Sequence, residues 1–372
     1  MKCKQVARWL IPCGMFVVAL ATTFMAAKVA GVDPLSGSSY SRFDSGHYLS
    51  IAKGGYDYFW CGGVHTHIGC GNAGWFPGYP MLIRAAHVLV PFLSWEVAGI
   101  VVSQSCFLFI LLFVWFRVLN EKLSLRNVLI LLFIGWYPNG IYFHVIFPYT
   151  AFLVCVLIAL DAASKARWRI SGVLGFLAAT IYPIGFLFSI PLAIATQLST
   201  QKSCCRFWRG ILMMGFVLYG TFTVLLYMFI STGIWNTYLS VQTKYKYADR
   251  TRNPFHWIWR LYNEGLFESI TIQQLSSLFT FSLLLICVAL VLFRRISTPT
   301  RGEIVTLIYG WIYWLFLVTV GYPSFHRADL FLFPVGVLAA RKMPLFFLII
   351  MIILGGYMRW YISVLFFQGK II

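Results

Sequence analysis

The sequence predicts an all-α polytopic membrane protein, because its composition, hydropathy and charge agree on that class. Of 372 residues, 60% are hydrophobic and 11% are charged, and the mean hydropathy is +0.80. Soluble domains carry roughly 25% charged residues. The net charge of +18 would indicate nucleic acid in a soluble chain. Here we interpret it as topology, since Lys and Arg hold loops in the cytoplasm, and we expect no nucleic-acid partner.

The first predicted helix is an apolar run from about Trp9 to Ala30. It follows Lys2, Lys4 and Arg8. A run of ~20 residues is long enough to span a bilayer, and no clean small-residue cleavage site of a signal peptide follows it. We therefore expect an uncleaved first span with its N-terminal end in the cytoplasm.

Ten further apolar runs bring the prediction to about eleven spans in one transmembrane domain, residues 1–372. Their approximate bounds are 97–118, 127–141, 146–163, 171–182, 184–198, 210–231, 275–294, 303–320, 329–340 and 344–364. Alternating sides then places six basic clusters in the cytoplasm: Lys2/Lys4/Arg8, Arg117/Lys122/Arg126, Lys165/Arg167/Arg169, Lys202/Arg206/Arg209, Arg294/Arg295/Arg301 and Arg341/Lys342. This agreement favours the orientation.

Two of the predicted helices are interrupted by proline, at Tyr137-Pro138-Asn139-Gly140 and at Tyr182-Pro183-Ile184-Gly185. Proline removes a backbone donor and kinks a helix. Inside a membrane such breaks persist only where protein or a wet cavity satisfies the freed groups. Both breaks lie near the predicted outer ends of their helices. Two long segments, 31–96 and 232–274, are expected on the same, non-cytoplasmic side.

Segment 31–96 contains the acid that we consider the best candidate for catalysis, Asp44. An acid beside a helix is often only a solvated loop residue. Asp44, however, is flanked by Arg42, His47 and Tyr48 and followed by glycines and aromatic residues, which are typical of a packed functional loop. A carboxylate that holds an acceptor hydroxyl within hydrogen-bond reach can act as a general base.

Basic residues on the predicted outer side contradict the charge bias, so they call for an anionic partner. They are Lys244, Lys246, Arg250, Arg252 and Arg327. A lipid phosphate can supply that partner, although general contact with anionic headgroups explains the run 244–252 equally well. Arg327 follows His326 and is expected to begin a helix, where backbone donors favour anions.

Cys61 and Cys70 flank two histidines in the pattern Cys61-x3-His65-x-His67-x2-Cys70. The spacing matches no common structural zinc pattern closely. On an oxidising side the two cysteines would form a disulfide. We favour the disulfide over a metal site or unpaired thiols. Neither a P-loop nor a Rossmann glycine pattern is present.

The first long segment resembles the first lumenal loop of the PIG-V-like (GPI mannosyltransferase II-like) glycosyltransferases. The match comprises Phe43-Asp44 through Ile51-Ala52, then Gly55-Tyr56-Asp57-Tyr58 and Phe76-Pro77-Gly78-Tyr79-Pro80. Looser matches follow in the family's order: Tyr137-Pro138 with Phe143, Pro183-x-Gly185, Gln242, and Arg327 ahead of Phe333-Pro334. Together they cover about residues 40–340.

The resemblance implies a GT-C-type fold and transfer of a sugar, usually mannose, from a polyprenyl or dolichyl phosphate, with a catalytic Asp at the position of Asp44. Two positions depart from the family. An acidic residue is absent from Phe147-Pro148-Tyr149-Thr150, and Tyr182 replaces an Arg ahead of the Pro-x-Gly turn. These departures bear on the substrate more than on the fold.

On this basis we expect a mannosyltransferase-like enzyme in a bacterial or archaeal plasma membrane or in the ER membrane. Asp44 would deprotonate a hydroxyl of a lipid, glycan or protein acceptor on the non-cytoplasmic side. The expected substrate-binding residues are Arg42, His47, Tyr48, Tyr56, Asp57, Phe76, Gln242, Lys244, His326 and Arg327. Because the leaving lipid phosphate is stable as an anion, we expect no metal and no other cofactor.

Two other functional classes remain open at this point. Broken helices and stranded charges also fit a translocator of sugar-linked lipids, although no inverted repeat is visible and ionisable residues along a path are few. The two motif departures leave room for a non-catalytic membrane scaffold of the same fold.

Overall fold

The computed structural model describes residues 2–61, 68–199, 203–244, 271–292, 299–320 and 325–371. By length and composition, six of its helices can cross a membrane. They are α1 (Lys2–Val29), α4 (Trp95–Phe113, continued by the π-helical η2, Val114–Val118), α9 (Ser203–Thr232), α12 (Ile272–Leu292), α13 (Arg301–Val320) and α16 (Leu345–Phe367). The prediction of an all-α membrane protein is therefore confirmed, with six candidate spans in place of eleven among the described residues.

The other five predicted spans contain helices that are shorter. They are α5 (Leu125–Gly135), α6 (Tyr149–Ser164), α7 (Trp168–Ile181), η4 with α8 (Pro183–Phe188, Ser189–Gln197), and η6 with α15 (Asp329–Leu332, Phe333–Lys342). Even the 16-residue α6 is about 24 Å long, less than a hydrocarbon core of about 30 Å. Most of α6 and α15 is buried, so these helices form the interior of the bundle.

Both proline breaks leave short 3₁₀ segments packed in protein. α5 ends at Gly135, six residues before the predicted end, because Pro138 disfavours helical geometry at the residue before it. The chain then forms η3 (Gly140–Phe143), and residues 137–147 are buried throughout. η4 begins directly at Pro183, the position where a missing N–H is tolerated. Their burial explains how irregular backbone survives within an apolar bundle.

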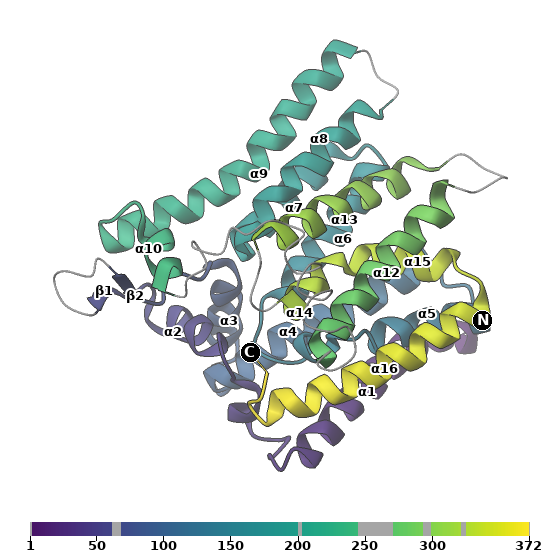
Figure 1. Ribbon diagram of the computed structural model, residues 1–372, viewed down its shortest axis with the longest axis horizontal. Helices are drawn as coiled ribbons and strands as arrows, with labels where there is room; N and C mark the ends of the chain where they lie inside the picture. Colours follow the sequence, from purple (N-terminus) through teal and green to yellow (C-terminus); the bar gives the residue numbers. More distant parts are fainter. Residues whose placement is uncertain are drawn as a thin grey trace, which may run out of the picture.

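The first long segment is a folded cap on one end of the bundle (Figure 1). It comprises η1 (Gly37–Tyr40), α2 (Ser45–Gly54), the antiparallel hairpin of β1 (Tyr58–Cys61) and β2 (Ile68–Gly71), and α3 (Gly78–Leu89). From the second long segment, α10 (Thr237–Lys244) packs on the hairpin, where the hydroxyls of Tyr58 and Ser240 lie 3.0 Å apart. The short α14 (Phe325–Ala328) lies near the middle of the view in Figure 1.

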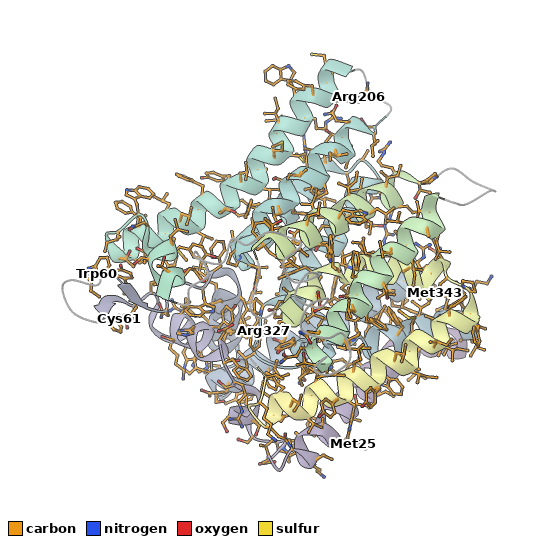
Figure 2. The ribbon with its side chains drawn as sticks, in the orientation of Figure 1. Met25, Trp60, Cys61, Arg206, Arg327 and Met343 are labelled. Carbon is orange, nitrogen blue, oxygen red and sulfur yellow. A yellow bond between two sulfur atoms is a disulfide. The ribbon has the colours of Figure 1, made fainter. Side chains whose placement is uncertain are left out.

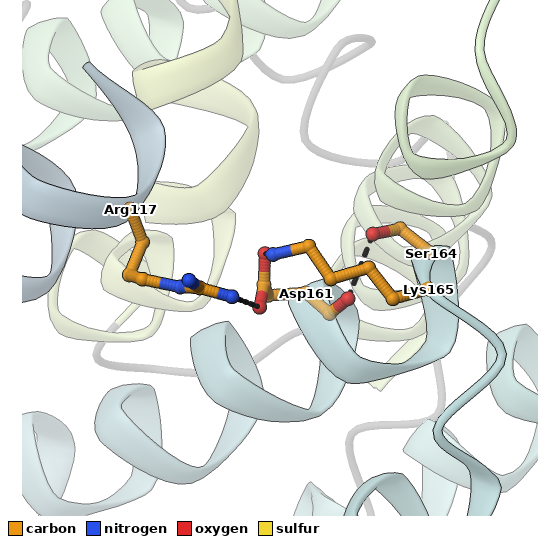
Figure 3. A network of polar contacts seen from close by, with 4 residues as sticks. All are labelled: Arg117, Asp161, Ser164 and Lys165. Carbon is orange, nitrogen blue, oxygen red and sulfur yellow. Dashed lines mark hydrogen bonds and ion pairs between the residues drawn. The ribbon is translucent and has the colours of Figure 1, made fainter. Parts of the chain in front are cut away.

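The opposite end of the bundle holds ion pairs between basic clusters and acids. Asp161 on α6 contacts Lys165 and, at 3.4 Å, Arg117, while its carbonyl oxygen accepts a hydrogen bond from the hydroxyl of Ser164 (Figure 3). Lys342 pairs with Glu303 at 2.5 Å. Such pairs each contribute only ~0–1 kcal/mol when exposed. Asp161 and Glu303 therefore each neutralise one or two of the basic residues that gather at this end.

Candidate functional site

Asp44 and Arg327 form an ion pair that joins the cap to the bundle. Oδ2 of Asp44 accepts a hydrogen bond from Nη1 of Arg327 at 3.0 Å, across 283 positions of sequence. The side chain of Arg327 is 2% exposed and that of Asp44 is 30% exposed. Figure 2 shows Arg327 well inside the outline of the molecule, while Cys61 is at its edge. One face of the carboxylate is thus anchored and the other is accessible.

The backbone before Asp44 is held in a conformation that an aromatic residue rarely adopts. Phe43 has φ of 53°, in the left-handed region, which costs an L-residue roughly 1–2 kcal/mol. Two contacts hold the turn: the Phe43 ring packs edge-on against Phe366 at 5.6 Å, and the Ser45 hydroxyl donates to the carbonyl oxygen of Ile146 at 3.1 Å. Because such strain clusters at functional sites, it supports a role for the adjacent acid.

Asp44 occupies the N-cap position of α2, yet its carboxylate makes no capping hydrogen bond. The side chain turns toward Arg327 instead. Its negative charge still lies at the positive end of the α2 dipole, which stabilises an anion there by a few tenths of a kcal/mol to about 1 kcal/mol. The position of Asp44 is therefore set by α2, and its negative charge is balanced by Arg327 of α14.

Aromatic side chains that the sequence analysis did not select surround the ion pair. The guanidinium carbon of Arg327 lies 5.5 Å from the ring centroid of Phe147, a cation–π geometry. Tyr142 packs edge-on against Phe147 at 5.2 Å. Burial raises the pKa of Tyr142, with Arg327 lowering it and Asp44 raising it further. The phenol therefore stays neutral beside both charges.

The candidate residues of α2 lie next to this cluster. Tyr48 is buried and packs edge-on against Phe147 and Tyr79, at 6.2 and 5.6 Å. His47 is half-buried and stacks on Trp75 with ring centroids 3.5 Å apart. Tyr48 thus belongs to the wall behind the ion pair, and His47 links α2 to the chain that follows the hairpin.

Tyr56, Phe76 and Gln242 instead fasten the cap to α9 and α10. The Tyr56 ring packs on Tyr227 of α9 with ring centroids 5.3 Å apart, its hydroxyl donates to a carbonyl oxygen within the cap at 2.9 Å, and burial raises its pKa. Phe76 is buried against Val224 and Met228 of α9. Nε2 of Gln242 donates to a backbone carbonyl oxygen of the cap at 2.7 Å. These contacts make the three residues structural supports of the cap.

The remaining candidates are placed less centrally or lie outside the described residues. Arg42 reaches the C-terminal end of α16, where Nη2 donates to the carbonyl oxygen of Phe367 at 3.4 Å. Asp57 is exposed, and its backbone bonds to Asn72. The side chains of Lys244 and His326, and residues 245–270 with the rest of the basic run, lie outside the described part of the chain.

Cys61 and Cys70 form a disulfide with Cα atoms 5.7 Å apart, across the β1–β2 hairpin. His65 and His67 lie outside the described residues, and within the described ranges no group of three His, Cys, Asp or Glu could hold a metal ion. One expectation needs correction: Arg327 does not begin a long helix. It is the third residue of the four-residue α14, so the ion pair and not a helix N-terminus defines its electrostatic setting.

No protein-family model and no curated protein matches the chain. Its class therefore rests on its own architecture: the chain is a multi-pass helical integral membrane protein with six candidate spans. A folded cap at one end carries a partly accessible carboxylate, directly after the strained backbone of Phe43, and this carboxylate pairs with a buried arginine.

Proposed function

We propose that the chain is a membrane glycosyltransferase that moves a hexose, in the first instance mannose, from a polyprenyl- or dolichyl-phosphate donor to an acceptor on the non-cytoplasmic side. The observation that carries the proposal is the Asp44–Arg327 pair. It unites, in one site, the acid and the cation that the sequence analysis selected separately. The resemblance of the cap sequence to PIG-V-like enzymes, with the GT-C fold it implies, supports the same assignment.

In the proposed reaction, Asp44 accepts the proton of the acceptor hydroxyl as the oxygen attacks the anomeric carbon of the donor sugar. The new carbon–oxygen bond forms as the bond between that carbon and the phosphate oxygen breaks, with inversion. The leaving group is a lipid phosphate monoester, and the proton passes from Asp44 to water. A general base of this kind contributes ~10²–10⁴ in rate.

Arg327 has two roles in this scheme. A guanidinium presents five N–H donors in a rigid fork, so the same side chain can orient Asp44 and bind the phosphate of the donor at the same time. The low exposure of Arg327 strengthens its interaction with an anion, since the surrounding aromatic rings exclude water. The donor sugar would then lie against the accessible side of the Asp44 carboxylate.

The test compares Asp44→Asn with Asp57→Asn in purified, reconstituted protein. Both variants remove one carboxylate charge from the cap. Asp57 was among the expected substrate-binding residues, but it is exposed and its backbone bonds to Asn72, so the proposed site does not include it. Hexose transfer is followed by mass spectrometry with mannosyl-phosphoryl-polyprenol as donor and membrane extract as acceptor. Rates are counted per folded molecule.

We expect Asp44→Asn to reduce transfer by ~10²–10⁴ while donor binding is retained, and Asp57→Asn to stay near wild type. Near-normal transfer by folded Asp44→Asn would eliminate Asp44 as the base. If wild type transfers no hexose, and wild type and Asp44→Asn move the sugar-linked lipid across vesicle membranes equally well, the translocator is favoured. Absence of both activities with intact binding to another membrane protein would favour the scaffold.

A further inference from the structure

A second buried arginine, Arg359, lies within the apolar helix α16 and is not part of the Asp44 site. Arg359 is 2% exposed. Its Nη2 donates to α1, to the carbonyl oxygen of Ala19 at 2.7 Å and the hydroxyl of Thr23 at 3.0 Å. Both acceptors are neutral. Ionisable residues inside membrane helices are costly and usually functional, so the role of this charge needs explanation.

Among the described residues no carboxylate pairs with Arg359, and its Nε and Nη1 are buried without a hydrogen-bond partner. The nearby ionisable side chain is another base: burial and the charge of Arg359 hold the pKa of His144 well below its usual range. The backbone of Gly140 covers the guanidinium, and a Cβ there would lie 3.3 Å from Nε. The surroundings therefore supply neutral acceptors and no counter-charge.

Arg359 also lines a cavity of about 290 Å³ between α1, α5 and α16. The other residues that line it are Thr22, Trp136, Ile353, Gly356, Tyr357, Trp360 and Ser363. Nε1 of Trp136 is a second buried donor without a partner. Figure 1 shows α1 and α16 side by side along one edge of the bundle. The residues that line the cavity thus include a cation and a second donor-bearing side chain among apolar groups, with the unbonded nitrogen atoms themselves covered.

The position of the cavity selects the kind of ligand. On α16, Ile353 is 63% and Tyr357 is 61% exposed, so this face is directed outward, to the membrane in a multi-pass protein. Arg359 is eight residues before the end of α16 at Phe367, about 12 Å along the axis. A ligand that reaches this depth from the side needs acyl chains and an anionic group.

We infer that the groove between α1, α5 and α16 binds an anionic phospholipid, whose headgroup phosphate pairs with Arg359. Nε and Nη1 are covered in the structure, so the guanidinium turns toward the cavity when the lipid binds. Trp136, Tyr357 and Trp360 line the same cavity and provide aromatic walls for the acyl chains. This site does not depend on the proposed transferase activity.

The experiment measures lipid retention by native mass spectrometry after reconstitution in mixed phosphatidylglycerol and phosphatidylcholine. Wild type should retain phosphatidylglycerol in preference to phosphatidylcholine. Arg359→Gln should retain about tenfold less, the loss expected for one charge-assisted hydrogen bond. Arg84→Gln is the matched control, because Arg84 is an exposed cation that also donates to a backbone carbonyl oxygen; it should retain lipid as wild type does.

A second variant keeps the test independent of how Arg359→Gln folds. Thr22→Leu narrows the cavity without changing charge, and it should also reduce retention. Equal retention of both lipids by wild type, or undiminished phosphatidylglycerol in folded Arg359→Gln or Thr22→Leu, would overturn the inference. Displacement of the lipid by inorganic phosphate would show a site for free phosphate and would likewise overturn it.

Discussion

We predict that removing Asp44 and removing Arg327 from their ion pair destabilise the protein by different amounts. Asp44→Asn leaves a guanidinium that is 2% exposed without this carboxylate, whereas Arg327→Gln leaves a carboxylate that is 30% exposed. Water can solvate the second charge but not the first. Removing one partner of a buried pair costs ~3–5 kcal/mol. We expect Asp44→Asn near the lower bound, because the amide oxygen still accepts one hydrogen bond, and Arg327→Gln at about 1–2 kcal/mol.

The coupling between the two residues can be bounded from the 3.0 Å distance. At an effective dielectric constant of 20, two unit charges at this separation attract by about 5.5 kcal/mol. Partial solvation of the carboxylate lowers the net value. A hydrogen bond between charged groups contributes ~1.5–3 kcal/mol, so we expect a coupling energy of about 2 kcal/mol in a double-mutant cycle.

The cycle is measured by reversible denaturation in mixed micelles, following helicity for wild type, both single variants and the Asp44→Asn/Arg327→Gln double variant. The double variant should be more stable than the sum of the single losses predicts. Additive losses would show that the pair does not form in the folded protein. A larger loss for Arg327→Gln than for Asp44→Asn would show that Arg327 is not the more buried partner.

Three further predictions concern the cap and the orientation. Cys61→Ser should cost about 2.5–3 kcal/mol of unfolding free energy, from the short loop that the disulfide closes, and the wild-type thiols should resist alkylation until reduced. Gly71→Ala should melt at lower temperature, since φ is +107° and a Cβ would lie 2.0 Å from a carbonyl oxygen. Gly46→Ala, in open space on α2, should not. A cysteine at exposed Ser38 should react with an impermeant reagent from outside intact cells, and one at exposed Lys122 should not; the reverse pattern would invert the topology.

The positions of the helices could largely be predicted from apolar runs, but their role could not. The runs at 127–141 and 146–163 look like spans, because hydropathy records the apolar character of a segment and not what it faces. In the structure α6 is surrounded by protein. The predicted helix likewise continued past Pro138 to Ile141, although Gly140–Phe143 form a 3₁₀ turn near the ion pair.

The site could be predicted one residue at a time but not as a pair. Asp44 stands out through its loop and Arg327 through its expected side of the membrane, yet their contact joins positions 283 apart, and it depends on how the whole bundle packs. Phe147 and Tyr142 were missed for the same reason: aromatic residues are so frequent in this chain that their identity carries no signal until Arg327 lies against them.

Arg327 and Arg359 show why counting charges by side of the membrane finds only some functional cations. Both side chains are 2% exposed. Arg327 lies in a connecting segment, where the topology argument counts it, while Arg359 lies inside a predicted span, where that argument does not look. Their energetic situations also differ: Arg327 has a carboxylate at 3.0 Å, whereas Arg359, within the described part of the chain, bonds to neutral acceptors on α1. The charge of Arg327 is thus neutralised within the chain, whereas a counter-charge for Arg359 is sought outside it, and the inferred phospholipid is therefore the subject of its test.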